Sequence, residues 1–237
     1  MLGKYIEVER VKKEVDFVNL AITTKSVNSK SKEDLVNTFN NNEFNLNNLS
    51  SNIQIHSDIV NIIDKDSVGL KKEGDALITN LKDTPLLVFT ADCVPIAIID
   101  KNNKAIGAVH AGWRGTYSQI SKNTIELMKK EYNTNTDDLL CVIGPSIGAC
   151  CYEVSKDLVE KFNTIITNKE EKFYIIREEK YYLDLWKINE HILKSCGVKE
   201  ENIINLNICT SCNSDKFHSY RIHEKTDKRI GLIIQMK

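Results

Sequence analysis

Three residues in separate parts of the chain have side chains that could bind one metal ion together. They are His56, Cys93 and His110. Two imidazoles and one thiolate leave the fourth position of a tetrahedral zinc ion open, as in zinc sites that do chemistry. Their spacing is far longer than in a zinc finger, so the fold must bring three segments together. We therefore predict one zinc ion per chain at these residues, with copper as the alternative metal.

Two glycines bracket the residues that follow His110. In His-Ala-Gly-Trp-Arg-Gly-Thr, Gly112 and Gly115 flank Arg114 where a predicted strand turns into a helix. Glycine permits backbone conformations that a side chain forbids, and a helix N-terminus attracts anions. A guanidinium is also suited to phosphate or carboxylate. The segment predicts an anion site beside His110; a tight turn with a surface arginine is the alternative.

Two further segments carry polar groups that could line a cleft. Asp92 precedes Cys93 at the end of an apolar run, and a partly buried carboxylate needs a polar partner. Near the C-terminus, Phe217-His-Ser-Tyr-Arg221 places rings, a hydroxyl and a guanidinium close together. In a cleft, Phe217 or Tyr220 could stack on a planar base and Arg221 could hold phosphate. Taken alone, this pentapeptide would be an ordinary strand.

The other paired cysteines predict no second metal site. Cys150 and Cys151 are adjacent, so on a strand their side chains would point to opposite faces, one into the core and one into the cleft. Cys209 and Cys212 have the Cys-x-x-Cys spacing of half a four-cysteine zinc site or of a redox pair. The sequence shows no second pair with this spacing. We expect a structural role at a strand end and predict that Cys212 is dispensable.

The composition is that of an ordinary globular protein. Charged residues make up 27% and hydrophobic residues 41% of 237 residues, and the net charge is −1. This balance gives no sign of a nucleic-acid partner. No signal peptide or long apolar span is evident, so we expect a cytoplasmic protein without membrane contact, in which the seven cysteines are reduced. The length suits one large domain or two small ones, and we expect a single domain over residues 1–237.

Short apolar runs alternate irregularly with helical stretches. Six runs rich in β-branched residues predict strands, at residues 53–55, 76–79, 86–90, 95–99, 105–110 and 139–143. The 3.6-residue period predicts helices over 116–132 and 184–196, the latter capped by Asp184 and ended by Gly197. A third helix opens at residues 31–34, with Leu35, Val36 and Phe39 facing inward. The pattern favours an α/β or α+β fold with mixed sheets.

Together these segments resemble the YfiH family, whose members have been called laccase-domain or multicopper polyphenol oxidases, peptidoglycan editing factors and purine nucleoside phosphorylases. The resemblance covers roughly residues 50–235. It rests on seven motifs in the order of the family: Gln-Ile-His at 54–56, Gly-Asp-Ala-Leu-Ile-Thr at 74–79, Thr-Ala-Asp-Cys-Val-Pro-Ile at 90–96, His-Ala-Gly-Trp-Arg-Gly-Thr at 110–116, Ile-Gly-Pro-Ser-Ile-Gly-Ala-Cys-Cys-Tyr-Glu-Val at 143–154, Cys-Thr at 209–210 and Phe-His-Ser-Tyr-Arg at 217–221.

The resemblance implies a layered α/β sandwich related to the catalytic domain of cytotoxic necrotizing factor toxins. It also implies a metal site at His56, Cys93 and His110. The chain departs from the family pattern at Ser57, where glycine is frequent, and at Ile222, where a second arginine is common. If that arginine holds phosphate, Lys228 or Arg229 would have to replace it.

The resemblance also implies the cleavage of adenosine, inosine, guanosine and methylthioadenosine with phosphate, and the deamination of adenosine. A zinc-dependent enzyme with these activities is the leading functional hypothesis. Arg114 and Arg221 are the candidate phosphate ligands, with Tyr220 beside them, and Asp75 or Asp92 the candidate for proton transfer. A copper-dependent polyphenol oxidase is one alternative, although five histidines are few for several coppers.

Another alternative is a metal-free Cys93/His110 thiol hydrolase that edits peptidoglycan precursors. Under the leading hypothesis the partners are purine nucleosides and phosphate. The expected assembly is a monomer or weak homodimer.

Overall fold

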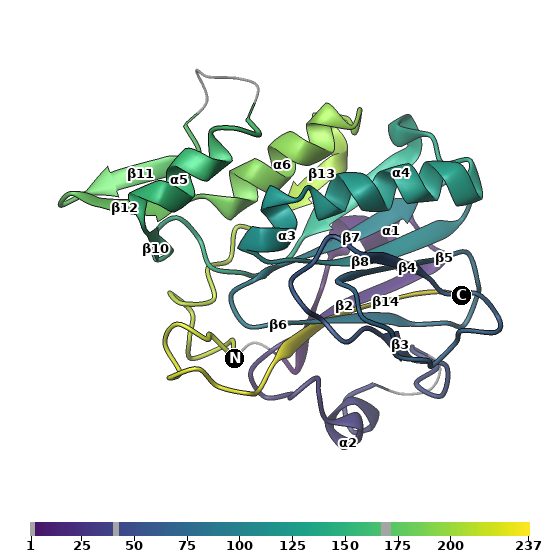
Figure 1. Ribbon diagram of the computed structural model, residues 1–237. Helices are drawn as coiled ribbons and strands as arrows, with labels where there is room; N and C mark the ends of the chain where they lie inside the picture. Colours follow the sequence, from purple (N-terminus) through teal and green to yellow (C-terminus); the bar gives the residue numbers. More distant parts are fainter. Residues whose placement is uncertain (1–2, 40–42, 167–171) are drawn as a thin grey trace.

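The computed structural model describes residues 3–39, 43–166 and 172–237, and its centre is a mixed six-stranded sheet (Figure 1). The strand order is β13 (Ile203–Asn205), β9 (Leu139–Ile143), β7 (Val94–Asp100), β8 (Ala105–Ala111), β5 (Ala76–Thr79) and β4 (Val60–Ile62). The four inner strands pair antiparallel, whereas β13 and β4 join the two edges in parallel. This sheet carries two of the three predicted metal ligands at or beside the ends of β7 and β8.

A five-stranded sheet packs against one face of the six-stranded sheet. Its order is β1 (Tyr5–Glu7), β2 (Val18–Thr23), β14 (Ile230–Met236), β6 (Leu86–Thr90) and β3 (Ser50–Ser51). The C-terminal strand β14 lies between β2 and β6 and pairs antiparallel with both. The first and last parts of the chain thus share one sheet.

Helices cover the other face of the six-stranded sheet (Figure 1). They are α3 (Trp113–Tyr117), α4 (Ile120–Tyr132), α5 (Lys156–Phe162) and α6 (Leu185–Ser195). A small antiparallel sheet of β10 (Glu153–Val154), β12 (Lys180–Leu183) and β11 (Tyr174–Arg177) extends beside α5. The short helix α2 (Lys32–Val36) lies beyond the five-stranded sheet, and α1 (Glu9–Glu14) contributes Val11 to the core between the two large sheets.

The residues of β7 show how one strand supplies two cores. Ile96 and Ile98 face the helices, whereas Ala97 and Ile99 face the five-stranded sheet, and all four are wholly buried. Successive side chains of a strand point to opposite faces, so a strand covered on both sides is apolar throughout. The continuous apolar runs of the central strands therefore mark the middle layer of the fold.

Most predicted elements are present. Strands β5, β6 and β9 have the predicted bounds, and β7 and β8 extend the predicted ranges by one or two residues. Helix α6 has Asp184 as its N-cap, whose side chain accepts a hydrogen bond from the Lys187 N–H, and Gly197 follows it at φ +97°. Helix α2 begins within the predicted residues 31–34, and the Ser31 side chain caps it.

Three details of the prediction are wrong. Residues 53–55 form no strand. Only Ile53 makes an isolated bridge, to Glu73, and the Ile55 N–H donates to the buried Asp75 carboxylate instead of to a neighbouring strand. The helix predicted over 116–132 is divided into α3 and α4 by Gln119, which has a left-handed φ of +57°. Val36 is exposed, although Leu35 is buried.

Within the described ranges, no helix combines the length and the apolar character that a membrane span requires.

Replacing Ile98 by alanine should test the central layer. The side chain is wholly buried between β7 and the helices, so Ile98→Ala should lower the free energy of unfolding by about 2–5 kcal/mol. The matched control is Ile176→Ala on β11, where the side chain is 56% exposed and the change should stay within about 0.5 kcal/mol. Urea unfolding followed by circular dichroism measures both, and equal midpoints would contradict this arrangement of the layers.

Candidate metal centre and substrate pocket

A buried carboxylate organises the centre of the site. Asp75 precedes β5 and is wholly buried, and its oxygens accept hydrogen bonds from the backbone N–H groups of Ile55, His56 and Ser57. The Ser57 hydroxyl donates a fourth hydrogen bond, at 2.7 Å. Asp75 Oδ1 also lies 2.7 Å from Nδ1 of His110 on β8. One side chain therefore fixes both the segment that carries His56 and the ring of His110.

The three predicted ligands converge beside this carboxylate. Nδ1/Nε2 or Sγ atoms of His56, Cys93 and His110 lie within 4.8 Å of one another. Cys93 Sγ lies 3.9 Å from His56 Nε2, and the two imidazole rings are 4.9 Å apart and nearly perpendicular. These contacts bring together the three segments whose convergence the sequence required.

The donor set and its surroundings fit a tetrahedral zinc ion. With ordinary zinc–sulfur and zinc–nitrogen bond lengths, a thiolate and an imidazole nitrogen on one zinc ion are about 3.6 Å apart. The 3.9 Å separation of Cys93 and His56 is close to that value. His110 has its Nδ1 held by Asp75, so Nε2 is the nitrogen free to bind a metal, and a carboxylate in this position is typical of metal-ligating histidines.

The backbone is shaped closely around these ligands. His56 has a left-handed φ of +61°, which a non-glycine residue adopts only when the surroundings stabilise it. Here the three N–H bonds to Asp75 supply that stabilisation. A Cβ at Gly112 would lie 3.0 Å from His56 Cδ2 and 3.1 Å from Cys93 Sγ, so this position needs glycine for close approach.

The electrostatics of the three groups favour a thiolate. Burial alone would raise the pKa of the Cys93 thiol, but the charge and hydrogen bond of His110 outweigh burial and lower it to about 6. Burial also lowers the pKa of His110, but the Cys93 thiolate and the Asp75 carboxylate raise it to about 9. Burial raises the pKa of Asp75, but hydrogen bonds from His110 and Ser57 lower it to about 2. Thiolate is the form of cysteine that binds metals.

Asp92 connects this centre to the C-terminal part of the chain. It precedes Cys93 at a left-handed φ of +86°, and Oδ1 accepts a hydrogen bond from the Thr210 hydroxyl at 2.6 Å. Oδ2 accepts hydrogen bonds from the Ser219 hydroxyl and the Arg221 backbone N–H. The predicted polar partners of Asp92 are thus confirmed, and they hold the loop that carries Tyr220 and Arg221 against the metal centre.

A cavity of about 920 Å³ opens over the three ligands. It is lined by all three of them and by Asp92, and by the candidate substrate residues Arg114, Tyr220 and Arg221. Lys30, Lys71 and Arg229 add further positive charges to the wall. The cavity has the size of an ordinary ligand site and has more cationic than anionic side chains.

The candidate residues differ in how they meet the cavity. Arg114 is exposed and its guanidinium lies 4.5 Å from the Trp113 ring, while the Arg221 guanidinium lies 5.6 Å from the Tyr152 ring.

Phe217 is wholly buried and does not line the cavity, so Tyr220 is the ring of residues 217–221 that can contact a ligand. Residues 217–221 form a loop of turns, and the alternative of an ordinary strand is wrong. Arg229, named as a substitute for the missing second arginine, lines the cavity.

The sequence analysis did not identify three residues whose side-chain hydrogen bonds hold the segments of the site in place: Gln54, Ser57 and Thr210. Gln54 exchanges two hydrogen bonds with the backbone of Phe89 on β6, at 2.7 and 2.8 Å, and so anchors the segment that carries His56. Ser57 and Thr210 bond to the two aspartates. Gln54 and Thr210 stand in the motifs quoted above, but a hydrogen bond between distant segments has no signal in composition or periodicity.

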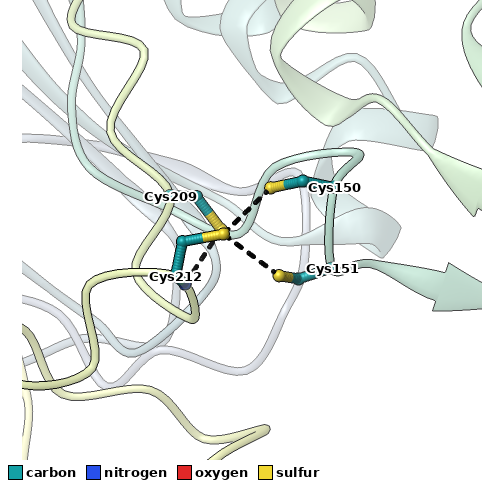
Figure 2. Close-up of side chains that lie close together, drawn as sticks. All are labelled: Cys150, Cys151, Cys209 and Cys212. Carbon is teal, nitrogen blue, oxygen red and sulfur yellow. Dashed lines mark hydrogen bonds between the residues drawn. The ribbon is translucent and has the colours of Figure 1, made fainter.

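The predicted placement of Cys150 and Cys151 on a strand, with one side chain in the cleft, is wrong. Cys150 and Cys151 lie in a turn and not on a strand, and their sulfurs each lie 3.4 Å from that of Cys212. Together with Cys209 they form a second group of potential metal ligands, shown in Figure 2. Neither Cys150 nor Cys151 lines the cavity.

The chain is similar in sequence to known proteins. Residues 10–237 match the family model described as multi-copper polyphenol oxidoreductase laccase. A purine nucleoside phosphorylase from Clostridium acetobutylicum is 41% identical over 188 residues, which are 78% of this chain and 75% of that protein. A protein named adenosine deaminase, from an unknown prokaryotic organism, is 35% identical over 179 residues, which are 71% of this chain and 67% of that protein.

A solved structure shares the whole fold. The hypothetical protein YfiH from Bacillus licheniformis superposes with a TM-score of 0.87 and 24% identity, over 100% of this chain and 97% of that one. The predicted mixed α/β fold is therefore confirmed.

The Asp75 carboxylate provides a test of the metal centre. Asp75→Asn should weaken zinc binding about 10- to 100-fold, because it removes the charged partner of His110. Asp100→Asn is the matched control, since this wholly buried carboxylate accepts backbone hydrogen bonds at the opposite end of β7. Competition with a chromogenic zinc chelator measures both affinities. Equal zinc affinities in the two variants would show that Asp75 does not support the metal.

Proposed function

The chain belongs to the multi-copper polyphenol oxidoreductase laccase family, as the resemblance to the YfiH family predicted, and from this we propose that it is a zinc-dependent purine nucleoside phosphorylase. One observation carries the proposal. The cavity joins a three-ligand metal centre to a cationic wall and an accessible aromatic ring, which are the groups that phosphate and a nucleoside need. The substrates proposed are adenosine, inosine, guanosine and methylthioadenosine.

The cationic wall suits the phosphate co-substrate. Phosphorolysis requires phosphate to attack C1′ of the ribose while the bond from C1′ to the purine nitrogen breaks. Arg114 and Arg221 come from two different segments and both line the cavity, which Arg229 lines as well. Guanidinium groups bind phosphate oxygens in a forked geometry, which would orient the attacking oxygen. We assign Arg114 and Arg221 to phosphate.

The purine must leave with the electron pair of the broken bond. The proton that hydrogenphosphate gives up can neutralise the departing base, so that ribose 1-phosphate and the free purine are the products. Asp92 lines the cavity, whereas Asp75 is wholly buried and does not line it. We therefore assign proton transfer to Asp92 and the positioning of His110 to Asp75. Tyr220, which is 46% exposed at the cavity wall, can stack on the base.

His56, Cys93 and His110 would hold the zinc ion at the floor of this cavity. Three protein ligands leave one coordination position for Lewis-acid chemistry on a bound substrate. Adenosine deamination is a second reaction proposed for the same centre. It is favoured by this open position and by the 35% identical relative that is named adenosine deaminase.

The copper oxidase hypothesis has less support from the site. Oxidation with several coppers needs many imidazole ligands. All five histidines lie in the described part of the chain, and only His56 and His110 take part in a group of potential metal ligands there.

A metal-free thiol hydrolase has more support from the geometry than the copper oxidase has. Asp75, His110 and Cys93 lie in a connected series like that of a cysteine hydrolase. Zinc that protects Cys93 from alkylation would argue against the hydrolase.

The requirement for phosphate tests the reaction type. Purified zinc-loaded protein should release hypoxanthine from inosine only when phosphate is present, with one ribose 1-phosphate formed for each base. Chromatography of the products with and without phosphate measures this. Equal base release in phosphate-free buffer would identify a hydrolase in place of a phosphorylase.

Arginine variants test the cationic wall. Arg114→Ala should raise the KM for phosphate about 10- to 150-fold, since losing one charged hydrogen-bonding partner is worth about 1.5–3 kcal/mol. Arg10→Ala is the control, because Arg10 lies outside the cavity and pairs with Glu14 on α1. Steady-state kinetics at varied phosphate separate the two variants. An unchanged KM for phosphate in Arg114→Ala would remove Arg114 from the phosphate site.

A further inference from the structure

Four cysteine sulfurs meet outside the substrate cavity. The Sγ atoms of Cys150, Cys151, Cys209 and Cys212 all lie within 4.8 Å of one another (Figure 2). Two come from the turn between β9 and β10, and two from the loop between β13 and β14. None of the four lines the cavity over His110, so this group is separate from the metal centre described above.

The turn explains how two adjacent cysteines face the same neighbours. The Gly148 carbonyl accepts hydrogen bonds from the N–H groups of Cys151 and Tyr152, which closes the turn before β10 begins. In a strand, Cys150 and Cys151 would alternate between two faces. In this turn both sulfurs lie 3.4 Å from Cys212 Sγ.

Backbone hydrogen bonds also favour a thiolate in the loop that carries Cys209 and Cys212. The backbone N–H of Cys212 donates to Cys209 Sγ at 3.5 Å, and that of Gly148 donates to the same sulfur at 3.3 Å. Donors aimed at sulfur favour the thiolate, and such outer hydrogen bonds are typical of metal-ligating side chains. One of these donors comes from each segment, so the backbone of both converges on Cys209.

We propose that Cys150, Cys151, Cys209 and Cys212 bind a structural zinc ion. Four thiolates on one zinc ion, with bonds of about 2.3 Å, lie about 3.8 Å apart, which agrees with the observed sulfur separations. An iron–sulfur cluster requires a wider arrangement, because inorganic sulfides separate its irons. With four protein ligands the coordination is complete, so this zinc ion has a structural role, unlike the open centre at His110.

The position of this site indicates which part of the structure the zinc ion would stabilise. The loop between β13 and β14 supplies Thr210, Ser219 and Arg221, which hold the Asp92 carboxylate, and Tyr220 of the cavity wall. This loop has few regular elements of its own within the described residues. A zinc ion between the loop and the turn would fasten it close to Thr210, next to the residues that shape the cavity.

Other contacts hold the two segments together without the ion. Ser146 forms a parallel bridge with Cys209, and the Thr210 N–H donates to the Ser146 carbonyl at 3.0 Å. The Arg177 guanidinium donates to the Cys150 carbonyl at 2.7 Å. A variant that lacks one thiol should therefore keep its fold.

The sequence-based expectation that Cys212 is dispensable depends on the lack of a second cysteine pair. The four-cysteine group supplies that pair and removes this premise.

Zinc content per chain tests the proposal directly. Elemental analysis of purified Cys212→Ser protein should show one zinc equivalent fewer than the unmodified protein prepared in the same way. Cys196→Ser is the matched control, because Cys196 is a partly exposed free cysteine outside the group, and its zinc content should not change. Equal zinc content in Cys212→Ser and the unmodified protein would overturn the proposal, as would a loss of the same size in Cys196→Ser.

A cobalt titration keeps the proposal testable if Cys212→Ser folds poorly. Cys93→Ser protein has no thiolate at the His56 centre but keeps all four cysteines of the group. After removal of metal, one equivalent of cobalt should give the intense sulfur-to-cobalt absorption of a tetrathiolate site, and zinc should abolish it. Absence of this absorption at stoichiometric cobalt, with the four thiols reduced, would refute the site. Iron recovered in place of zinc would refute its assignment to zinc.

Discussion

The candidate site depends on the hydrogen bonds that stabilise one buried charge, the carboxylate of Asp75. A buried carboxylate is costly unless hydrogen-bond donors surround it. Here the donors are three successive backbone N–H groups, the Ser57 hydroxyl and the His110 ring. Because these donors belong to the two segments that carry His56 and His110, the arrangement that stabilises the charge also aligns two of the proposed metal ligands. The left-handed backbone of His56 follows from the same constraint.

A second set of contacts connects the metal centre to the end of the chain. Asp92 holds Thr210, Ser219 and Arg221, and β14 then returns to the middle of the five-stranded sheet. The cavity wall is thus built by a loop that is anchored at both ends. The proposed zinc site at the four cysteines would add a third anchor. The metal ion at His56, Cys93 and His110 would take part in the proposed reaction, and the ion at the four cysteines would stabilise the loop that forms the cavity wall.

The sequence predicts the parts of the structure that follow from local periodicity. The apolar runs of β5 to β9 give their strands, and Asp184 and Gly197 give the ends of α6. The left-handed Gln119 that separates α3 from α4 has no such signal, because both helices continue the same apolar pattern. Nor does the spacing of Cys150 and Cys151 show that they lie in a turn, where both sulfurs can face the same neighbours, and not on a strand. Chemistry and family resemblance single out His56, Cys93 and His110, which the structure brings together, but the backbone contacts that hold these side chains depend on distant segments.

The most direct test of the central claim is anomalous X-ray diffraction at the zinc absorption edge. Crystals of zinc-loaded protein with a bound purine nucleoside would be used. The account predicts an anomalous peak within bonding distance of His56, Cys93 and His110, with the nucleoside in the cavity between that peak and Tyr220. A nucleoside bound elsewhere, or no anomalous peak at these three side chains, would contradict it.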